Sequence, residues 1–372
     1  MQKEKVKIGI IGCGNISGKY MESLNCLFEN TLVYAICDMD FRNAEKRAEE
    51  YHIPHVCKSN EELLAMDEVE IVVILTNPSS HYEIVKQSLL AGKHTYVEKP
   101  LALNEEDGRE LLYLAKEKKV MICAAPDSIL GAGWQTARKL MEDGWIGEPI
   151  AAISHILTGG PESWHPNPAF LYHIGAGPLY DVAVYWAAGL SYLFGPVSSA
   201  MCAAKKTYEQ RIIGSQPLRG QVIDVEVPTY LAGILHMENG VICSIHHSFD
   251  VPHTLLDNRV EIYGTRGTIV VPAPDVFCDD ISYRGKEDKE WSKIPPLFAY
   301  RSNCRGIGVA DMADALREGR EPRLNGEFAF HTLETLVRLE ESAKEREAKK
   351  VKSRYEITPI MPMEAVWGPD RE

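Results

Sequence analysis

The sequence predicts an α/β protein, in which a doubly wound parallel sheet is followed by an α+β domain with a mostly antiparallel sheet. In the first third, near-continuously apolar strands alternate with helical segments, as in parallel sheets covered on both faces. Later, short strands with turn signals dominate, and Asn239-Gly240 is a hairpin signal. A chain of 372 residues suits two domains. We expect them over residues 1–125 and 126–372.

The elements of the first domain follow one another in a regular strand–helix order. The expected strands cover Val6–Ile11, Thr31–Asp38, Glu70–Thr76, His94–Val97 and Val120–Ala125. The expected helices cover Ile16–Phe28, Arg42–Tyr51, Ser79–Ala91 and Glu105–Lys119. This order is typical of βαβ units, so the strands should be parallel.

The pattern changes in the second domain. The expected helices are Gly133–Asp143, Pro178–Leu193 and Glu327–Lys344, and the expected strands are Pro149–Leu157, Tyr230–His236, Val241–His247 and Val260–Tyr263. Residues Thr158–Gly177 are rich in Gly, Pro and aromatic side chains and should form a long loop. Long loops in compact domains are usually functional or disordered, and the aromatic content favours function.

Composition and charge exclude several classes of protein. The net charge of −13 opposes nucleic-acid binding, which needs a basic surface. The nine cysteines are scattered, none with zinc-site spacing, which indicates a reducing compartment and no metal. The N-terminus has no signal-peptide pattern, and no apolar run approaches the roughly 20 residues of a membrane span. We expect a cytoplasmic protein with no membrane partner.

The first strand ends in the motif Gly12-x-Gly14-x-x-Ser17, which precedes a predicted helix. This is the context of a dinucleotide-binding turn. Gly12 allows the tight turn, Gly14 lets the backbone approach a pyrophosphate, and the small Ser17 allows close packing of helix on strand. Asn15 and Ile16 lie between them and should also contact the cofactor. The motif alone is weak, but the βαβ order around it makes a simple glycine turn the minor alternative.

Asp38 ends the second strand, 24 residues after Gly14. A carboxylate there accepts hydrogen bonds from ribose hydroxyls and repels a 2′-phosphate, so NAD is favoured over NADP. Arg42 could counter this by binding a phosphate, although we prefer a solvated helix charge. A turn or capping role for Asp38 is about as common.

Two further segments end strands at the carboxyl edge of the sheet, where ligands bind in such folds. The first is Thr76-Asn77-Pro78, with His81 shortly after it; a histidine there is more often a packing residue than a catalyst. The second is Glu98-Lys99-Pro100, whose lysine can reach a substrate hydroxyl beside a nicotinamide. We place these residues in the cofactor site: Thr76, Asn77, Pro78, His81, Glu98 and Lys99.

Asp181 and Tyr185 lie four residues apart on a predicted, largely apolar helix and share one face. A carboxylate and a phenol on such a helix form a candidate site. The alternative is a buried tyrosine with a satisfied hydroxyl and a capping or paired aspartate.

Three of these motifs together resemble the Gfo/Idh/MocA oxidoreductases, the glucose–fructose oxidoreductase-like family. They are the glycine loop, Glu98-Lys99-Pro100 and the segment from Gly175 to Tyr185; Trp164–Pro168 and Gly306–Met312 also resemble segments of this family. The resemblance implies a Rossmann domain, a second domain with a large open sheet, and NAD(P)-dependent oxidation or reduction of a sugar or polyol. It also implies a homodimer or homotetramer.

The resemblance transfers site roles to Lys99 and Asp181. Many members carry histidine at the position of Tyr185 and others tyrosine, so the proton acceptor is Tyr185, Lys99 or His165. A free phenol has a pKa near ~10, and the Lys99 ammonium and a cationic nicotinamide would lower it. Asp181 would hold Lys99 or the substrate hydroxyl in place.

The loop before this helix should form one wall of a sugar site. The loop carries the aromatic residues Trp164, Phe170 and Tyr172 among polar residues. Aromatic faces pack against the C–H faces of sugar rings, and Asn167 and His165 can hydrogen-bond hydroxyls. The expected substrate contacts are Trp164, His165, Asn167 and Tyr172, with Lys99, Asp181 and Tyr185. Two other functions remain open: a non-catalytic NAD-binding sensor or scaffold, and a glycoside-cleaving enzyme that uses NAD transiently.

Overall fold

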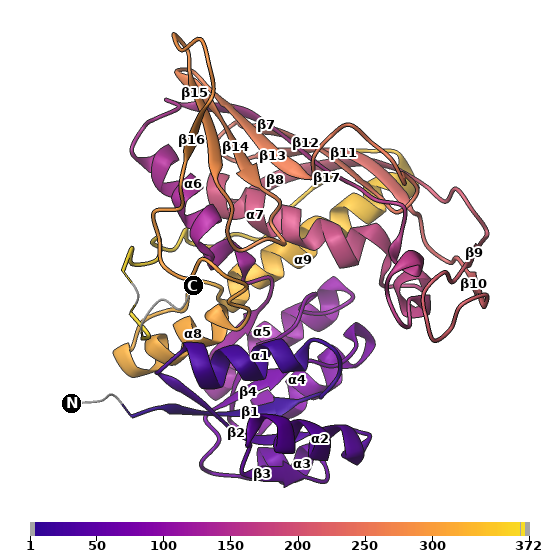
Figure 1. Ribbon diagram of the computed structural model, residues 1–372, viewed down its shortest axis with the longest axis vertical. Helices are drawn as coiled ribbons and strands as arrows, with labels where there is room; N and C mark the ends of the chain where they lie inside the picture. The colour runs from indigo at the N-terminus through magenta and orange to yellow at the C-terminus, as the bar shows by residue number, and fades with distance from the viewer. Residues whose placement is uncertain (1–3, 365, 369–372) are drawn as a thin grey trace.

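The computed structural model describes residues 4–364 and 366–368. Figure 1 shows a nine-stranded sheet at the top, a layer of helices in the middle and a six-stranded sheet domain at the bottom. This confirms the predicted fold class, a doubly wound parallel domain joined to an α+β domain with a large open sheet.

All neighbouring strands of the six-stranded sheet are parallel, and their order is β3-β2-β1-β4-β5-β6. The strands are β1 (Val6–Ile11), β2 (Thr31–Cys37), β3 (His55–Cys57), β4 (Ile71–Ile74), β5 (His94–Val97) and β6 (Ile122–Ala124). Successive strands are added on one side of β1 up to β3 and on its other side from β4 onward, so the switch point lies between β1 and β4. Such folds bind ligands at this point. The short β3 was not predicted, because only three residues form it.

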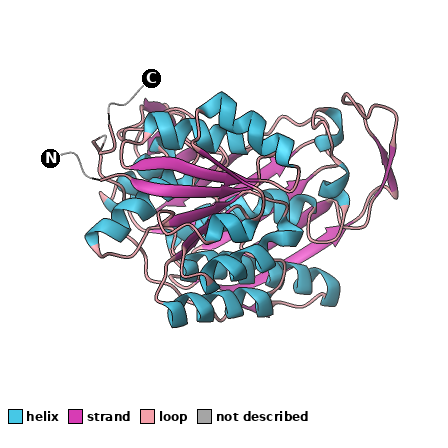
Figure 2. Cartoon of the chain, turned by 90° about the horizontal axis from the view of Figure 1, so that it is seen from below, coloured by secondary structure: helices cyan, strands magenta, loops and turns pink. Residues whose placement is uncertain are grey.

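The helices of this domain are α1 (Ser17–Glu22), α2 (Phe41–Tyr51), α3 (Asn60–Leu64), α4 (His81–Leu90) and α5 (Glu105–Lys118). Helices lie on both sides of its strands in the view of Figure 2. The predicted first helix is shorter than expected, because a π-helical turn, Ser23–Leu27, replaces its second half. Side chains cap α2, α3 and α5, namely Asp40, Ser59 and Asn104.

The nine-stranded sheet has the order β16-β15-β14-β13-β7-β12-β11-β8-β17. Its strands are β7 (Pro149–Leu157), β8 (Val197–Lys205), β11 (Tyr230–Met237), β12 (Ile242–Ser248), β13 (Arg259–Gly264), β14 (Gly267–Pro272), β15 (Ile281–Gly285), β16 (Ser292–Ile294) and β17 (Lys349–Lys350). Neighbours are antiparallel except β7 and β12. The predicted hairpin at Asn239-Gly240 joins β11 to β12. A separate two-stranded ribbon consists of β9 (Gln210–Ile212) and β10 (Val222–Asp224).

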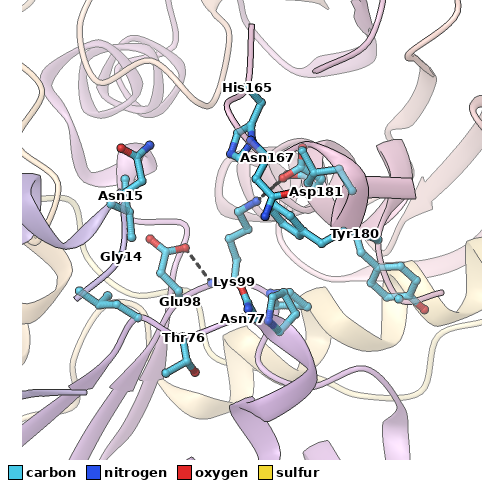
Figure 3. Close-up of a pocket in the computed structure, with 18 of the residues that line it drawn as sticks. Gly14, Asn15, Thr76, Asn77, Glu98, Lys99, His165, Asn167, Tyr180 and Asp181 are labelled. Atoms are coloured by element: carbon cyan, nitrogen blue, oxygen red, sulfur yellow. Dashed lines mark hydrogen bonds and ion pairs between the residues drawn. The ribbon is translucent and has the colours of Figure 1, made fainter. Parts of the chain in front are cut away.

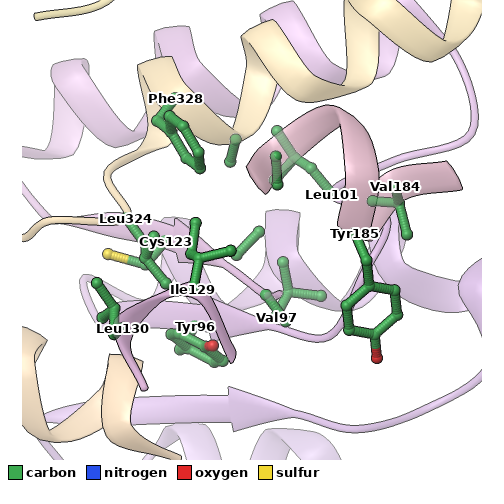
Figure 4. Close-up of a cluster of buried hydrophobic side chains, with 14 of the residues drawn as sticks. Tyr96, Val97, Leu101, Cys123, Ile129, Leu130, Val184, Tyr185, Leu324 and Phe328 are labelled. Atoms are coloured by element: carbon green, nitrogen blue, oxygen red, sulfur yellow. The ribbon is translucent and has the colours of Figure 1, made fainter. Parts of the chain in front are cut away.

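Helices α6 (Ala132–Glu142), α7 (Val184–Phe194) and α9 (Gly326–Glu345) lie on the inner side of this sheet, and α8 (Ile307–Glu318) lies lower, beside α1. The last two return to the first domain. Arg338 of α9 forms an ion pair with Glu105, and a Cβ on Gly108 of α5 would lie 2.8 Å from the side chain of Leu333. The core is therefore continuous between the two sheets, as Figure 4 shows for part of it.

The predicted helix Pro178–Leu193 is divided in two. Residues Pro178–Ala183 form a π-helical turn, and α7 begins only at Val184. The expected long loop before it contains two short 3₁₀ turns, Pro161–Ser163 and Ala169–Tyr172. π-Helical turns widen a helix locally and are frequent at functional sites. Within the described residues, no helix is both long and apolar enough to cross a membrane.

Candidate functional site

A cavity of about 560 Å³ lies at the carboxyl edge of the parallel sheet, beside the switch point, and extends to the second domain. Figure 3 shows Gly14, Glu98 and Lys99 on one side of it, and His165 and Asp181 on the other. Most of the predicted site residues line it: Gly14, Asn15, Ile16, Thr76, Asn77, Pro78, Glu98, Lys99, His165, Asn167, Asp181 and Tyr185. Six do not: Gly12, Ser17, Asp38, His81, Trp164 and Tyr172.

The glycine loop has the geometry that a dinucleotide requires. Gly12 has a φ of +102°, and a Cβ on it would lie 2.9 Å from the carbonyl carbon of Leu75, so only glycine fits. A Cβ on Gly14 would meet nothing within 4 Å, because this residue faces the open cavity. The buried Ser17 donates a hydrogen bond of 2.7 Å to the Gly14 carbonyl and holds the loop from behind. The loop therefore leaves room for a pyrophosphate.

Asp38 lies directly after β2 and next to this loop. One carboxylate oxygen accepts a 2.6 Å hydrogen bond from the backbone N–H of Cys13, and the other accepts one of 2.8 Å from Asp40. Arg42 is exposed, and its guanidinium is bound by both carboxylate oxygens of Asp40. Asp38 thus holds the glycine loop in place, and Arg42 is bound at the start of its own helix.

His81, which was expected among the cofactor contacts, does not line the cavity. It is fully buried, with Nδ1 2.8 Å from the carbonyl oxygen of Pro100 and Nε2 3.1 Å from that of Thr76. Burial lowers its pKa. The imidazole therefore links the two strand-end segments behind the cavity wall, as a packing residue would.

Lys99 and Asp181 form the central ion pair of the site. The ammonium donates to Oδ1 of Asp181 at 2.7 Å and to its backbone carbonyl at 2.9 Å (Figure 3). Burial alone would lower the pKa of Lys99, but Asp181, Tyr185 and Glu98 together outweigh that effect, so the pKa is raised. Lys99 is therefore a fixed cation, and it is a poor proton acceptor at neutral pH.

Tyr185 is buried, with its ring beside the ammonium of Lys99, 5.3 Å from the ring centroid. Its hydroxyl oxygen lies 3.4 Å from Nη1 of Arg305. Figure 4 shows the phenol at one side of the apolar cluster, with the oxygen directed away from the other labelled side chains. Burial raises its pKa; Lys99 and Arg305 lower it, but by less. The net direction is opposite to the one expected from the sequence, because desolvation dominates.

His165 and Asn167 reach the cavity from the long loop (Figure 3). The backbone N–H of Asn167 donates a 3.0 Å hydrogen bond to Nδ1 of His165. A neutral imidazole in this arrangement carries its proton on Nε2. Burial lowers the pKa of His165. The free nitrogen of this histidine is therefore a hydrogen-bond donor, which disfavours it as the proton acceptor.

Two aromatic side chains of this loop that were expected at the substrate do not line the cavity. Trp164 is 68% exposed, and its ring packs against that of His165. Tyr172 is fully buried in a small second core with Phe249, and its hydroxyl donates to Glu162. Of the three aromatic residues Trp164, Phe170 and Tyr172 in this loop, Phe170 lines the cavity. Aromatic content alone cannot distinguish a ligand wall from a loop core, because both need large apolar faces.

Two other lining residues were missed from the sequence. Tyr180 donates a 2.8 Å hydrogen bond to Glu340 of α9 at the edge of the cavity. Arg305 is buried, and its Nη1 lies 3.6 Å from Oε1 of Glu98. Arg305 directly precedes the Gly306–Met312 segment noted above, but arginine is mostly exposed, so the sequence carried no sign of its burial. Among the described residues, no cluster of three or more His, Cys, Asp or Glu side chains could hold a metal.

Two family models match the chain. Residues 6–125 match an oxidoreductase family with an NAD-binding Rossmann fold. Residues 134–270 match the GFO/IDH/MocA C-terminal domain. The two matches meet near residue 130 and together include every motif of the cavity except Arg305.

Individual members of known function and structure are similar to this chain at low sequence identity. The chain is 25% identical to D-glucoside 3-dehydrogenase of Escherichia coli, over 67% of this chain and 72% of that protein. It is 23% identical to myo-inositol 2-dehydrogenase of Thermotoga maritima, over 71% and 74% of the two chains. The solved structure of levoglucosan dehydrogenase in complex with NADH superposes with a TM-score of 0.82 at 19% identity, covering 94% of this chain and all of the other. That likeness is one of fold.

Proposed function

Because this chain belongs to the Gfo/Idh/MocA family of NAD-binding oxidoreductases, we propose that it transfers a hydride between a sugar or polyol hydroxyl and a nicotinamide. The observation that carries the proposal is the Lys99–Asp181 pair, which lies with Tyr185 in the cavity that the glycine loop also lines. A protein that only binds NAD has no need of a buried cation and a phenol in that place.

The chemistry divides between the cofactor and the chain. When bound, NAD supplies the acceptor for the hydrogen that leaves the alcohol carbon with its electron pair, so the hydroxyl proton must pass to a residue of this chain. Gly14, Asn15 and Ile16 are placed to hold the dinucleotide, and Asp38 supports NAD rather than NADP. Lys99 is placed to polarise the substrate oxygen, and Asp181 orients Lys99.

Tyr185 is the proton acceptor that the geometry favours. Lys99 keeps its proton beside Asp181, and the Nδ1 of His165 is already an acceptor for Asn167. The phenol oxygen has a cation beside it and can carry a charge or a proton. A phenol with a raised pKa is protonated at neutral pH, which is the form that donates a proton during ketone reduction. Oxidation should therefore favour alkaline pH.

The substrate is proposed to be a carbohydrate. One wall of the cavity is the aromatic ring of Phe170, and Asn167 and His165 present hydrogen-bonding groups beside it. An aromatic face next to amide and imidazole groups suits the apolar and hydroxylated sides of a sugar ring. Two relatives act on a glucoside and on an inositol by name, which supports the same class here.

The experiment that tests this function is a panel of sugars, glycosides and inositols with NAD and NADP, followed by absorbance of the reduced cofactor. Accumulation of reduced cofactor with one or more of them supports the dehydrogenase. Glycoside cleavage without net reduced cofactor would instead point to transient use of NAD. Binding of NAD with no turnover of any kind would contradict the proposal and favour a sensor.

We also propose that the chain forms a homodimer or homotetramer through the outer face of the nine-stranded sheet. Met201, Ile234, Ser244 and Ile153 are successive cross-strand partners on β8, β11, β12 and β7, so they share one face. Three of the four are exposed apolar side chains. An apolar sheet face in water favours association. Light scattering at micromolar concentration should show a dimer or larger, and a monomer would overturn this proposal.

A further inference from the structure

Arg305 brings a second buried cation to the cavity, in addition to Lys99. It lies just before α8, far in sequence from the other site residues, and it is 9% exposed. Its Nη1 lies 3.4 Å from the hydroxyl oxygen of Tyr185 and 3.6 Å from Oε1 of Glu98. Burying a guanidinium costs free energy unless charged or polar groups compensate it. The burial of Arg305 in this cavity therefore points to a role for its charge.

The position of Arg305 is fixed from the backbone. The buried Asp127 accepts hydrogen bonds on one carboxylate oxygen from the N–H groups of Gly306 at 2.7 Å and Gly308 at 3.3 Å. Gly306 has a φ of +102°, which allows the chain to turn directly after Arg305. The ring of Phe277 lies against the guanidinium, 5.6 Å from centroid to carbon. Asp127 thus fixes the backbone directly after Arg305, and Phe277 packs against the guanidinium.

The hydroxyl of Tyr185 faces Arg305 rather than Lys99. Lys99 lies over the face of the ring, and its ammonium is bound by Asp181. Glu98 is the carboxylate that opposes these cations, and it is itself bound by the Tyr20 hydroxyl at 2.8 Å. Both cations have a carboxylate partner, Asp181 for Lys99 and Glu98 for Arg305. Arg305 is the one whose N–H lies within hydrogen-bond distance of the phenol oxygen.

We propose that Arg305 is a positioning residue that stabilises the phenolate form of Tyr185 through the contact of its guanidinium with the phenol oxygen. This inference rests on the proposed oxidation, in which the substrate hydroxyl proton passes to the phenolate oxygen of Tyr185 and yields a neutral phenol. Burial raises the pKa of Tyr185, and the cations of Lys99 and Arg305 oppose that rise. Removing Arg305 removes one of the two opposing charges and leaves Lys99 in place.

The first test is the pH profile of kcat/KM for oxidation of whichever sugar the panel identifies. The neutral variants Arg305→Gln and Arg305→Met should move the rising limb of the profile upward by roughly 1–3 pH units, the usual effect of a nearby opposite charge. Arg305→Lys keeps the charge and should move it less. A matched control is Arg317→Gln on α8, the helix that follows Arg305. Arg317 pairs with Glu70, just before β4, and does not line the cavity. The rising limb of the Arg317→Gln profile should lie at the same pH as that of the wild type.

The second test needs no substrate. Ultraviolet difference titration reports tyrosinate, and comparing each protein with the same protein carrying Tyr185→Phe isolates Tyr185. Its ionisation midpoint should rise in Arg305→Gln and Arg305→Met and stay unchanged in Arg317→Gln; either neutral variant that folds is sufficient. If the ionisation midpoint of Tyr185 is unchanged in the neutral Arg305 variants, the proposed role of Arg305 is wrong, even if the enzyme is active. A raised midpoint without turnover of any sugar would support that role and contradict the proposed oxidation.

Discussion

The ammonium of Lys99 and the carboxylate of Asp181 lie 2.7 Å apart, although 82 residues separate them in the chain. The first follows a strand of the parallel sheet, and the second lies on the π-helical turn of the second domain. The contact therefore joins the first-domain side of the cavity to its second-domain side. A lysine held in this way presents its remaining N–H to a fixed point in the cavity.

Replacement of Lys99 by methionine should abolish most turnover and leave NAD binding nearly unchanged. Methionine keeps the length of the side chain and removes the cation that polarises the substrate oxygen, so kcat should fall by about 10²–10³-fold. Isothermal titration with NAD and steady-state kinetics measure the two effects. The matched variant Asp181→Asn keeps the lysine charge, and it should lower turnover less. A weaker affinity for NAD with normal kcat would place Lys99 at the pyrophosphate instead.

Tyr185→Phe removes one oxygen from a buried ring, so the fold should persist. If that oxygen accepts the proton, turnover should fall by about 10²–10⁴-fold. Wild-type oxidation should accelerate with rising pH, because the phenolate is the active form and burial raises the pKa of the phenol; the variant should lose this dependence. Circular dichroism and a pH–rate profile check both points. His165→Ala is the comparison, and an inactive His165→Ala beside an active Tyr185→Phe would reverse the assignment.

The sequence predicted the parts of the site that depend on local rules. The turn at Gly12 needs positive φ, and strand-end residues such as Asn77 and Lys99 reach the cavity because parallel strands end at one edge. Arg305 could not be predicted, because its burial depends on contacts with Glu98, Tyr185 and Phe277 from distant segments.

The same limit explains the errors in the long loop. Trp164, Phe170 and Tyr172 are equally plausible as sugar contacts from composition alone. The structure buries Tyr172 under the β9–β10 ribbon, leaves Trp164 in solvent and turns only Phe170 to the cavity. Which aromatic faces the ligand depends on how the loop folds on itself, and no local pattern encodes that.

Phe170 and Trp164 offer a matched pair of variants for the substrate wall. Phe170→Ala removes the aromatic ring that lines the cavity and should raise KM about 3- to 10-fold, since such ring contacts contribute about 1 kcal/mol. Trp164→Ala removes an exposed ring and should change KM little. Steady-state kinetics on the substrate found in the panel compares them. A larger effect at Trp164 would show that the loop closes over the sugar.

Asp38 should determine the choice between NAD and NADP. Its carboxylate lies beside the glycine loop, where it repels a 2′-phosphate, and Arg42 is occupied by Asp40. Asp38→Ser should weaken the binding of NAD and strengthen the binding of NADP. The dissociation constants of the two cofactors should therefore become more alike. Asp40→Ala is the informative companion, because it frees Arg42 without touching Asp38. Titrations that show tighter NADP binding by the wild type would contradict the assignment.

The buried Asp127 should make stability depend on pH in the acidic range. Burial raises its pKa from 3.8 to about 6, although Arg305 and the Gly306 N–H oppose this. Between these values the folded state binds more protons than the unfolded state, so this stabilising contribution is complete below the lower value and is lost as pH rises through about 6. Relative to Asp127→Asn, the wild type should lose on the order of 2 kcal/mol of unfolding free energy between pH 4 and pH 7. Denaturant unfolding at both pH values measures it, with the exposed Asp280→Asn as control. A pH-independent difference between wild type and Asp127→Asn would mean that the carboxyl stays charged throughout, held by the two N–H groups that also place Arg305.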